Sequence, residues 1–315
     1  MPGPAILVTG AGGFVGQHLV GALETAFPGG RLIPTGLAGH DRLDITDKAA
    51  LAAMFGVQRP DFCIHLAAIS AIGAAGADPA QSWGINCQGT INVGRAILEH
   101  SPAARLVFIS TAEVYGASFK PGLPVTEAAP LAPMNTYAAT KAAAEMGLCA
   151  LAASGLRVIR LRPFNHTGPG QREDFVVPAF AGQIARIEAG LSAPEMLVGN
   201  LDSERDFLDI ADVCAAYIAL IRKFDELPNN LALNISTGQT IRIGAILEKL
   251  LALTGETITI RQDPARLRPS EILRAAGDPA EAARLLNWRP RKSLDETIAA
   301  VLDDARRQTA DRPGP

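Results

Sequence analysis

A tyrosine and a lysine four residues apart could carry out proton transfer. Tyr137 and Lys141 open a predicted helix that follows Pro133. A spacing of four places both side chains on one helix face, one turn apart. A phenol with an ordinary pKa near ~10 exchanges protons poorly at neutral pH, and a nearby cation lowers that pKa by about 1–3 units. The pair is a candidate acid–base centre, although the same spacing is common on solvated helices.

Two hydroxyl groups and a carboxylate follow a strongly apolar run. Residues 107–109 are typical of a buried strand, and Ser110, Thr111 and Glu113 come directly after it. Ligands of open α/β sheets bind at the carboxyl ends of the strands. A hydroxyl there could hydrogen-bond a carbonyl oxygen as charge develops on it. Either Ser110 or Thr111 could do this, and either could instead simply cap the end of the strand.

Glycines separate the first predicted strand, residues 5–9, from the helix that follows. Gly10 suits a tight turn, Gly13 lets backbone N–H groups approach a pyrophosphate, and Gly16 allows close packing of helix on sheet. The N-terminus of that helix also carries partial positive charge. The pattern predicts a dinucleotide-binding loop.

The residues after the second predicted strand bear on which dinucleotide binds. An acid at the end of that strand would hold a ribose 2′-hydroxyl, whereas an arginine would suit a 2′-phosphate. Residues 34–42 place no acid at the strand end, and Arg42 lies beyond it. We expect NADP(H) to be preferred, with NAD(H) possible.

Strands and helices alternate through the first half of the chain. The predicted strands are residues 5–9, 31–35, 62–66, 105–110 and 157–161, and the predicted helices are 14–27, 48–55, 79–100 and 137–153. This alternation predicts an α/β fold with a Rossmann-type, doubly wound parallel sheet. After Arg162, proline and glycine interrupt the pattern. We expect a smaller C-terminal substrate-binding lobe there.

The predicted division of the chain follows from this change. A dinucleotide-binding domain would span residues 1–165, with 207–237 returning to it. The smaller lobe would comprise residues 166–206 and 238–305. Residues 306–315 are polar and end in Arg-Pro-Gly-Pro, so we expect a frayed tail.

Composition excludes several classes of protein. The 315 residues include 29 basic and 32 acidic side chains, and the net charge of -3 argues against a broad nucleic-acid-binding face. The longest apolar run, residues 213–221, is far shorter than the ~20 residues that a membrane span requires. No export signal is apparent, and the four cysteines are widely separated. We therefore expect a cytoplasmic protein with reduced thiols and no metal site.

Together, the glycine loop, residues 110–116 and the Tyr137/Lys141 pair resemble an extended short-chain dehydrogenase/reductase of the nucleotide-sugar-modifying group. The resemblance covers residues 4–305. It implies that Thr111, Tyr137 and Lys141 form the catalytic set. Glu113 stands where dehydratases of this group carry a base, so it is a further catalytic candidate. Its alternative role is that of a hydrogen-bonding residue at the pocket.

The resemblance also implies two sets of binding residues. The cofactor would be bound by Gly10, Gly12, Gly13, Phe14, Val15, Gly16, Asp44, Ile45, Leu66, Ala67, Ala68, Tyr137, Lys141, Pro163 and His166. The substrate would be bound by Asn165, Val177, Gly199, Asn200, Arg205, Arg268 and Glu271. Arg205 suits a diphosphate because its planar fork can bind two oxygens at once. For His65 we expect the role of a buried histidine with its hydrogen bonds satisfied.

The substrate motifs, residues 165–171, 199–206 and 268–271, resemble those of enzymes that act on GDP-mannose derivatives. The implied reaction is NAD(P)H-dependent reduction of the C4 keto group of a GDP-linked 6-deoxy-4-ketohexose, which would give GDP-D-rhamnose or its C4 epimer. The alternatives are a GDP-mannose 4,6-dehydratase, an epimerase of another nucleotide sugar, and a redox-sensing binding protein. The dehydratases carry a basic loop after the second strand, which is missing here. Relatives commonly form homodimers through a four-helix bundle, here residues 81–100 and 137–153.

Overall fold

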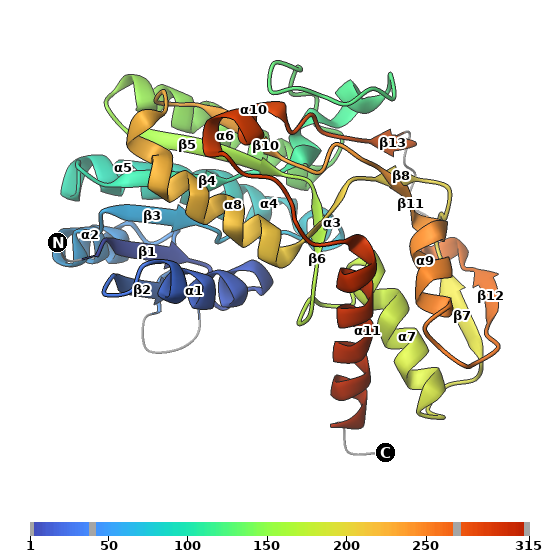
Figure 1. Cartoon of the computed structure of the whole chain (residues 1–315). Coiled ribbons are helices and arrows are strands. Elements are labelled where there is room, and N and C mark those ends of the chain that lie inside the picture. Colours follow the sequence, from blue (N-terminus) through green and yellow to red (C-terminus); the bar gives the residue numbers. More distant parts are fainter. Residues whose placement is uncertain (1–2, 38–41, 267–271, 312–315) are drawn as a thin grey trace.

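A six-stranded parallel sheet forms the larger part of the molecule (Figure 1). The computed structural model describes residues 3–37, 42–266 and 272–311. The strands follow the order β10-β5-β4-β3-β1-β2, and all five neighbouring pairs are parallel. Their bounds are β1 Ala5–Thr9, β2 Arg31–Thr35, β3 Phe62–His65, β4 Arg105–Ile109, β5 Arg157–Pro163 and β10 Ala232–Ile235. The predicted Rossmann-type sheet is confirmed.

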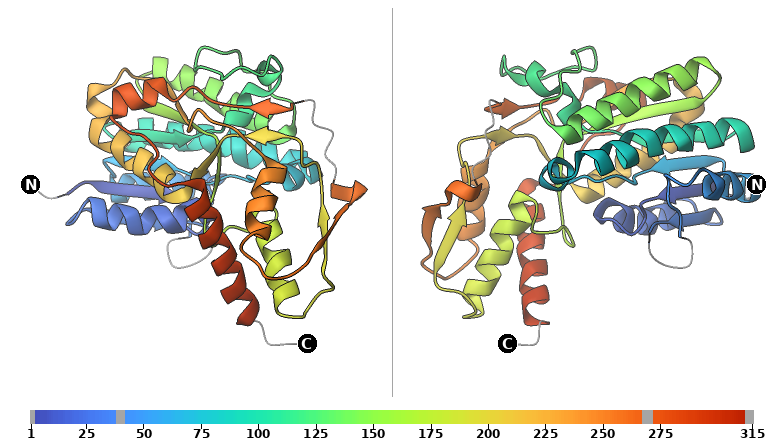
Figure 2. Two further views of the ribbon diagram at one scale, coloured as in Figure 1. Left: turned by 45° about the vertical axis from the view of Figure 1, so that its right-hand side comes forward. Right: turned by 180° about the vertical axis from the view of Figure 1, so that it is seen from behind.

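Helices cover both faces of this sheet because its strands are apolar on both sides. On one face, α1 (Phe14–Ala26) and α8 (Ile210–Lys223) pack against alternate residues such as Val107 and Ile109. On the other, α2 (Lys48–Gln58), α5 (Thr90–His100) and α6 (Thr136–Ala153) pack against residues such as Leu106 and Phe108. Figure 2 shows α5 and α6 side by side in the view from behind.

The long helix predicted over residues 79–100 contains a change of helical type. It comprises α4 (Pro79–Ser82), a π-helical segment η1 (Trp83–Gly89) and α5. Short π-helical segments occur frequently at functional sites. The preceding α3 (Ile72–Ala77) is a separate helix.

The smaller lobe has its own hydrophobic core. Its helices are α7 (Val176–Glu188), α9 (Ile243–Leu251) and α11 (Leu294–Ala310), and α7 and α11 run side by side at the lower right of Figure 1. Its strands form two small sheets, β7 (Glu195–Val198) with β12 (Thr259–Gln262), and β11 (Ile241–Arg242) with β8 (Glu204–Arg205) and β13 (Arg274–Ala275). Strand β6 (Asn165–Thr167) pairs with β9 (Phe207–Asp209). In the sequence β6 follows β5, and β9 precedes α8. Further short helical segments are η2 (Ala112–Phe119), η3 (Phe224–Glu226) and η4 (Pro264–Arg266).

Two segments differ from the predicted division of the chain. The expected frayed tail is helical as far as Ala310, because Arg306 forms two hydrogen bonds of 2.8 Å to Glu188 on α7. The other segment is α10 (Ala280–Leu286), which lies within the range assigned to the smaller lobe. The side chains of Leu286 and Trp288 are instead buried in the apolar cluster between α8 and the central sheet.

Gly116 brings the loop before α6 onto η2. Its φ of +46° is in the left-handed region, and a Cβ at this position would overlap the carbonyl oxygen of Ala132. Ala132 accepts a hydrogen bond from Ala117 at 2.8 Å and donates one to Val114 at 3.0 Å. Only glycine permits this close approach. It fixes the chain just before the start of α6.

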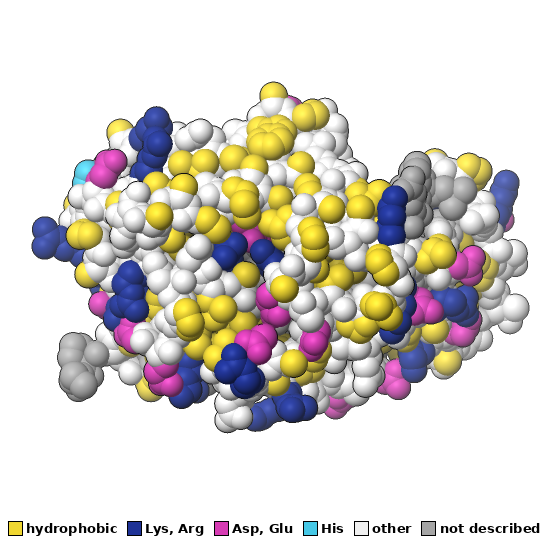
Figure 3. Space-filling model, turned by 90° about the horizontal axis from the view of Figure 1, so that it is seen from above, with side chains coloured by type: hydrophobic (Ala, Val, Ile, Leu, Met, Phe, Trp, Pro, Cys, Tyr) yellow, Lys and Arg dark blue, Asp and Glu magenta, His cyan; other side chains and the backbone are white. Residues whose placement is uncertain are grey.

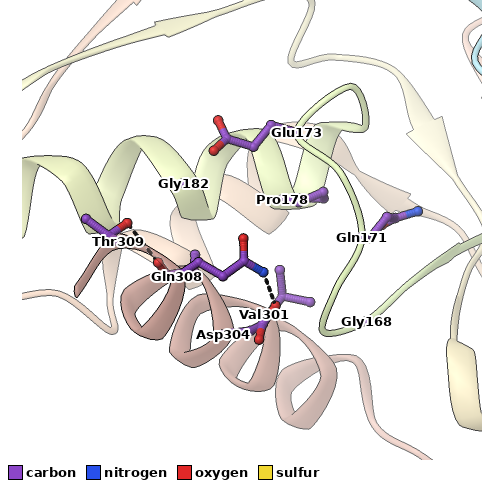
Figure 4. A pocket seen from close by; sticks show the side chains of 10 residues that line it. Gly168, Gln171, Glu173, Pro178, Gly182, Val301, Asp304, Gln308 and Thr309 are labelled. Atoms are coloured by element: carbon purple, nitrogen blue, oxygen red, sulfur yellow. Dashed lines mark hydrogen bonds between the residues drawn. The ribbon is translucent and has the colours of Figure 1, made fainter. Parts of the chain in front are cut away.

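A small crevice lies between α7 and α11 (Figure 4). It is lined by Gly168, Gln171, Glu173, Pro178, Gly182, Val301, Asp304, Ala305, Gln308 and Thr309. None of the candidate catalytic residues borders it, so it is not the candidate active site.

The surface seen from above in Figure 3 has many hydrophobic side chains over its middle, with side chains of both charges among them and toward the edges. That side shows no broad basic face among the described residues. No helix in the described part of the chain is long and apolar enough to cross a membrane.

Candidate active site

The end of β4 and the first turns of α6 bring the three predicted catalytic side chains together. Asn135 caps α6 by accepting a hydrogen bond of 2.8 Å from the N–H of Ala138, which places Tyr137 in the first turn. The hydroxyl of Thr111 is hydrogen-bonded to the Tyr137 phenol. The Lys141 ammonium donates to the carbonyl of Ile109 at 2.5 Å. The spacing of four therefore directs both α6 side chains to the tip of one strand.

The protonation of the pair follows from its surroundings. Burial raises the pKa of Tyr137 to about 12, although the hydrogen bond with Thr111 opposes this and the charge of Glu113 adds to it. Burial lowers the pKa of Lys141 to about 7, and Glu145 opposes that shift. The Lys141 ammonium also lies 4.2 Å from the centre of the Phe108 ring. Tyr137 is thus a protonated phenol at neutral pH, able to donate its proton.

The two hydroxyls at the end of β4 have separate roles. Ser110 donates a hydrogen bond of 2.5 Å to the buried carboxylate of Glu145, so its proton is already engaged. Thr111 accepts from the N–H of Glu113 at 3.2 Å and also meets Tyr137. Thr111 is therefore both the cap of η2 and the hydroxyl of the candidate catalytic set.

Glu113 lies near this set of side chains. Its carboxylate accepts a hydrogen bond of 3.2 Å from the side chain of Asn135. Its charge acts on both Tyr137 and Arg205, because it raises the pKa of each. The carboxylate on η2 thus interacts electrostatically with a phenol on α6 and a guanidinium on β8. Burial nevertheless lowers the pKa of Arg205 overall.

The glycine loop between β1 and α1 has the shape that a dinucleotide requires. Gly10 has a φ of +73°, and a Cβ there would lie 2.7 Å from the backbone nitrogen of Ala67. A Cβ on Gly16 would lie 2.5 Å from the carbonyl oxygen of Gly10, whereas the space beside Gly12 is open. No side chain caps α1, and its first turn has no acid. Its N–H groups and partial positive charge are therefore available to a pyrophosphate.

Other predicted cofactor residues surround this loop. The backbone N–H groups of Leu66 and Ala67 bond to Thr9, which ties the start of the 66–68 segment to the end of β1. The ring of His166 stacks on Phe14, with ring centres 6.3 Å apart and planes within 6°. Burial lowers the pKa of His166, although the hydrogen bond to the carbonyl of Phe164 opposes the shift.

The remaining predicted cofactor residues also have defined positions. Asp44 accepts hydrogen bonds from the N–H and hydroxyl of Thr46, which lower its pKa. Ile45 and Pro163 are buried. Ala68 and Val15 are partly exposed. Asp44 is thus a partly exposed carboxylate with a fixed orientation.

His65 is the satisfied buried histidine that we predicted. Its Nδ1 lies 2.7 Å from the hydroxyl of Thr9, and its Nε2 lies 3.0 Å from the hydroxyl of Thr90. The Thr90 hydroxyl donates its proton to the carbonyl of Asn86, so it must accept from Nε2–H. Nδ1 therefore accepts from Thr9. Burial, helped by the charge of Lys141, lowers the pKa of His65 to about 3.

The predicted substrate residues are only partly brought together. Arg205 donates to the carbonyls of Glu204, Ile272 and Leu273, so these backbone groups fix the position of its guanidinium. Val177 is 1% exposed, and its side chain belongs to the core of the smaller lobe. A ligand could therefore reach only the backbone of Val177, at the N-terminus of α7, which no side chain caps.

The other predicted substrate residues occupy turns and edges. Asn165 is exposed on β6, and the side chain of Asn200 accepts from the N–H of Asp202. A Cβ on Gly199 would lie 2.6 Å from the carbonyl oxygen of Arg266. Arg268 and Glu271 lie outside the described residues.

The sequence reasoning missed several polar residues beneath the site. Asn86 in η1 bonds both the N–H and the carbonyl of Ile69 and donates to the hydroxyl of Thr140. Thr140 in turn donates to the carbonyl of Tyr137. Glu145, on α6, was also missed. Its spacing of four from Lys141 and eight from Tyr137 is a signal that could have found it.

Comparison with known proteins adds to this geometry. Residues 6–236 match the NAD dependent epimerase/dehydratase family. The chain is 36% identical over 301 residues to GDP-6-deoxy-D-mannose reductase of Pseudomonas aeruginosa, which covers 95% of this chain and 96% of that protein. It is 29% identical, with the same coverage, to GDP-6-deoxy-D-talose 4-dehydrogenase of Aggregatibacter actinomycetemcomitans. The structure of RMD from Pseudomonas aeruginosa complexed with NADPH matches with a TM-score of 0.88 and 33% identity, covering 97% of this chain and 99% of that one.

Acid should destabilise the fold through His65. Its folded-state pKa of about 3 lies below the ordinary value, so the unfolded chain takes up a proton that the folded chain does not. This contribution to stability is complete above about pH 6.5 and declines by roughly 1.4 kcal/mol per pH unit below that. Thermal melting at several pH values should show His65→Asn to be less stable than wild type at neutral pH but less sensitive to acid.

The matched control is His100→Asn, which removes an exposed ring from the end of α5. It should keep the acid dependence of the wild type. An equally steep acid dependence in His65→Asn and wild type would contradict the role given to His65.

Proposed function

Because the chain belongs to the NAD dependent epimerase/dehydratase family, we propose that it is a nucleotide-sugar reductase. Its reaction would be NADPH-dependent reduction of the C4 keto group of GDP-4-keto-6-deoxy-D-mannose to GDP-D-rhamnose. The observation that carries the proposal is an intact hydroxyl, tyrosine and lysine set at the end of β4, in a chain 36% identical to GDP-6-deoxy-D-mannose reductase over nearly its whole length. A binding protein without chemistry would have no need of this set.

The residues of the chain divide the chemistry between them. Bound NADPH would supply the hydride that adds to C4 of the sugar. Tyr137 would give its phenolic proton to the C4 oxygen, so that the hydride and the proton together convert the ketone to an alcohol. Thr111 would hydrogen-bond that oxygen, and the positive charge of Lys141 would stabilise the phenolate left on Tyr137. Solvent would then return a proton to Tyr137.

Binding would be shared between the two parts of the chain. The backbone of residues 10–16 would hold the pyrophosphate of the cofactor, with Asp44 and residues 66–68 along its length. The GDP group would lie against Arg205 and the N-terminus of α7, where Val177 offers its N–H. We propose a cytoplasmic location, because the four cysteines are free thiols.

One assay tests the reaction. The protein should oxidise one NADPH for each GDP-4-keto-6-deoxy-D-mannose reduced, and nuclear magnetic resonance should identify the product as the rhamno sugar. Tyr137→Phe should lower kcat by about 10²–10⁴-fold, because it removes the proton donor. It should leave the dissociation constant of NADPH nearly unchanged. Near-normal turnover in that variant would remove Tyr137 from the role.

The second candidate function is that of a GDP-mannose 4,6-dehydratase. It is favoured by the position of Glu113, whose carboxylate lies beside Tyr137 and could act as a base at C5. GDP-mannose with a catalytic amount of NADP would separate the two, because only a dehydratase forms the ketosugar under those conditions. Formation of the ketosugar would overturn the reductase proposal.

Arg42 is the proposed determinant of NADPH preference. Its backbone pairs with Gly36 just after β2, and a Cβ on Gly36 would lie 3.8 Å from the backbone nitrogen of Gly12. The segment therefore lies beside the glycine loop, where an arginine suits a 2′-phosphate. Arg42→Ala should raise the KM for NADPH about tenfold or more and change that for NADH little. Arg95→Ala, which removes an exposed arginine from α5, should change neither. Equal effects on both cofactors would contradict this assignment.

The face formed by η1, α5 and α6 is the proposed dimer interface. It carries two large apolar side chains with substantial exposure, Trp83 at 44% and Met146 at 53%. Small side chains would permit close approach of two such faces: Ala150 on α6 is exposed, whereas Ala144 is buried in the core of its own chain. Light scattering should give twice the chain mass of 33.0 kDa.

A substitution can test this interface directly. Met146→Glu should give the monomer mass, because it places charge in the apolar contact. Leu191→Glu, at an apolar site of similar exposure beyond the end of α7, should leave the dimer intact. A monomeric wild type would overturn the interface.

A further inference from the structure

Three consecutive residues at the end of β4 are joined to three positions of α6. Ile109 accepts from Lys141, Ser110 donates to Glu145, and Thr111 bonds Tyr137. The three α6 residues are spaced by four, so they form one row along the helix. Glu145 is the member of this row that the proposed reaction does not use.

The Glu145 carboxylate is completely buried and fully hydrogen-bonded. One oxygen accepts from Ser110 at 2.5 Å and from Nε of Arg162 at 3.0 Å. The other accepts from Arg162 at 2.6 Å and from Arg160 at 3.0 Å. Burial alone would raise the pKa of Glu145, but Arg162, Ser110 and Arg160 together hold it below its ordinary value. The group is therefore a carboxylate with a single orientation.

The two arginines fix this carboxylate to the rest of the sheet. Arg160 donates to the carbonyl of Asn230 at 2.6 Å. Arg162 donates to the hydroxyl of Tyr115 at 2.9 Å, and Tyr115 donates to Asn234 on β10 at 2.7 Å. Glu145 thus lies at the centre of contacts that join α6 to β4, β5 and β10.

Buried cations outnumber buried carboxylates in this region, and the half-buried carboxylate of Glu127 lies near Tyr115. Glu145 is one negative charge among three buried cations, Lys141, Arg160 and Arg162, and both arginines bind it directly. Lys141 forms no ion pair within 4.0 Å among the described residues, although Glu145 is the carboxylate whose charge favours its cationic form. The other groups near Lys141 are the neutral His65 on β3, the Phe108 ring and Ile109 carbonyl on β4, and Tyr137 on its own helix.

We propose that Glu145 is a positioning residue for the reaction, holding Ser110 so that Thr111 faces Tyr137 and providing the negative charge that Lys141 faces. This proposal rests on the proposed function, since the reaction defines which residues must be positioned. It assigns Glu145 no contact with cofactor or substrate. Both of its effects act through other residues, and each can be removed separately.

Glu145→Gln tests the charge. Glutamine keeps the size of the side chain but removes its negative charge, so protonation of Lys141 becomes less favourable. The alkaline limb of the pH profile of kcat should therefore move to lower pH, by about 1 unit. NADPH titrations followed by fluorescence should show weakening of cofactor binding at lower pH than in the wild type.

Ser110→Ala is the matched variant, because it removes only the hydrogen bond and keeps the carboxylate and both arginines. It should lower kcat about tenfold without moving the alkaline limb, and the KM for NADPH should change little. A folded Glu145→Gln variant with an unchanged alkaline limb would overturn the charge role. If Glu145→Gln does not fold, Ser110→Ala still decides the positioning role, and wild-type kcat in that variant would overturn it.

Failure of the proposed function would look different. A wild type that reduces no nucleotide ketosugar would remove the reaction. The shift in the pH dependence of NADPH binding in Glu145→Gln would still test the effect of Glu145 on Lys141. An unshifted dependence would then overturn this part of the proposal on its own.

Discussion

The contact between the end of β4 and one face of α6 is the constraint on which the candidate site depends. A strand tip can present a hydroxyl in only a few directions, and Thr111 meets Tyr137 because the residues on either side of that pair are also fixed. Lys141 holds the strand at Ile109, and Glu145 holds it at Ser110. The position of α6 is fixed in turn at its start by Asn135, and Gly116 fixes the loop that leads to it. The site is therefore a property of two packed elements rather than of three isolated side chains.

This arrangement requires charge to be buried where water is scarce. An unpaired ion in such a place would cost several kcal/mol, so each buried cation needs oxygen atoms as partners. Arg160 and Arg162 find them in Glu145 and in backbone carbonyls, and Lys141 finds one in Ile109. Burial of the apolar clusters on both faces of the sheet stabilises the fold and offsets the cost of burying these charges.

Sequence reasoning succeeded where the signal is local and failed where it depends on which strands become neighbours. The strands and helices of the first half, the glycine loop and the Tyr137/Lys141 face follow from periodicity and spacing, which act over a few residues. Glu145 can pair with Arg162 only because β5 lies beside β4 and α6 packs across both strands. No local sequence pattern predicts that arrangement. Residue types alone also left Ser110 and Thr111 open, and only the family resemblance named Thr111; the position of Glu145 shows why, since it already engages the Ser110 hydroxyl.

The charges around Tyr137 also bear on the direction of catalysis. Reduction begins with a protonated phenol, whereas a dehydratase or an epimerase begins by oxidising the sugar and needs the phenol to accept a proton. Burial and the negative charge of Glu113 both raise the pKa of Tyr137, to about 12. The hydrogen bond with Thr111 opposes this rise, and burial brings the pKa of Lys141 itself to about 7. The reduced nicotinamide ring is neutral and leaves this balance as it is. The surroundings therefore keep Tyr137 protonated in the cofactor-free chain, which is the state from which reduction of a ketone begins.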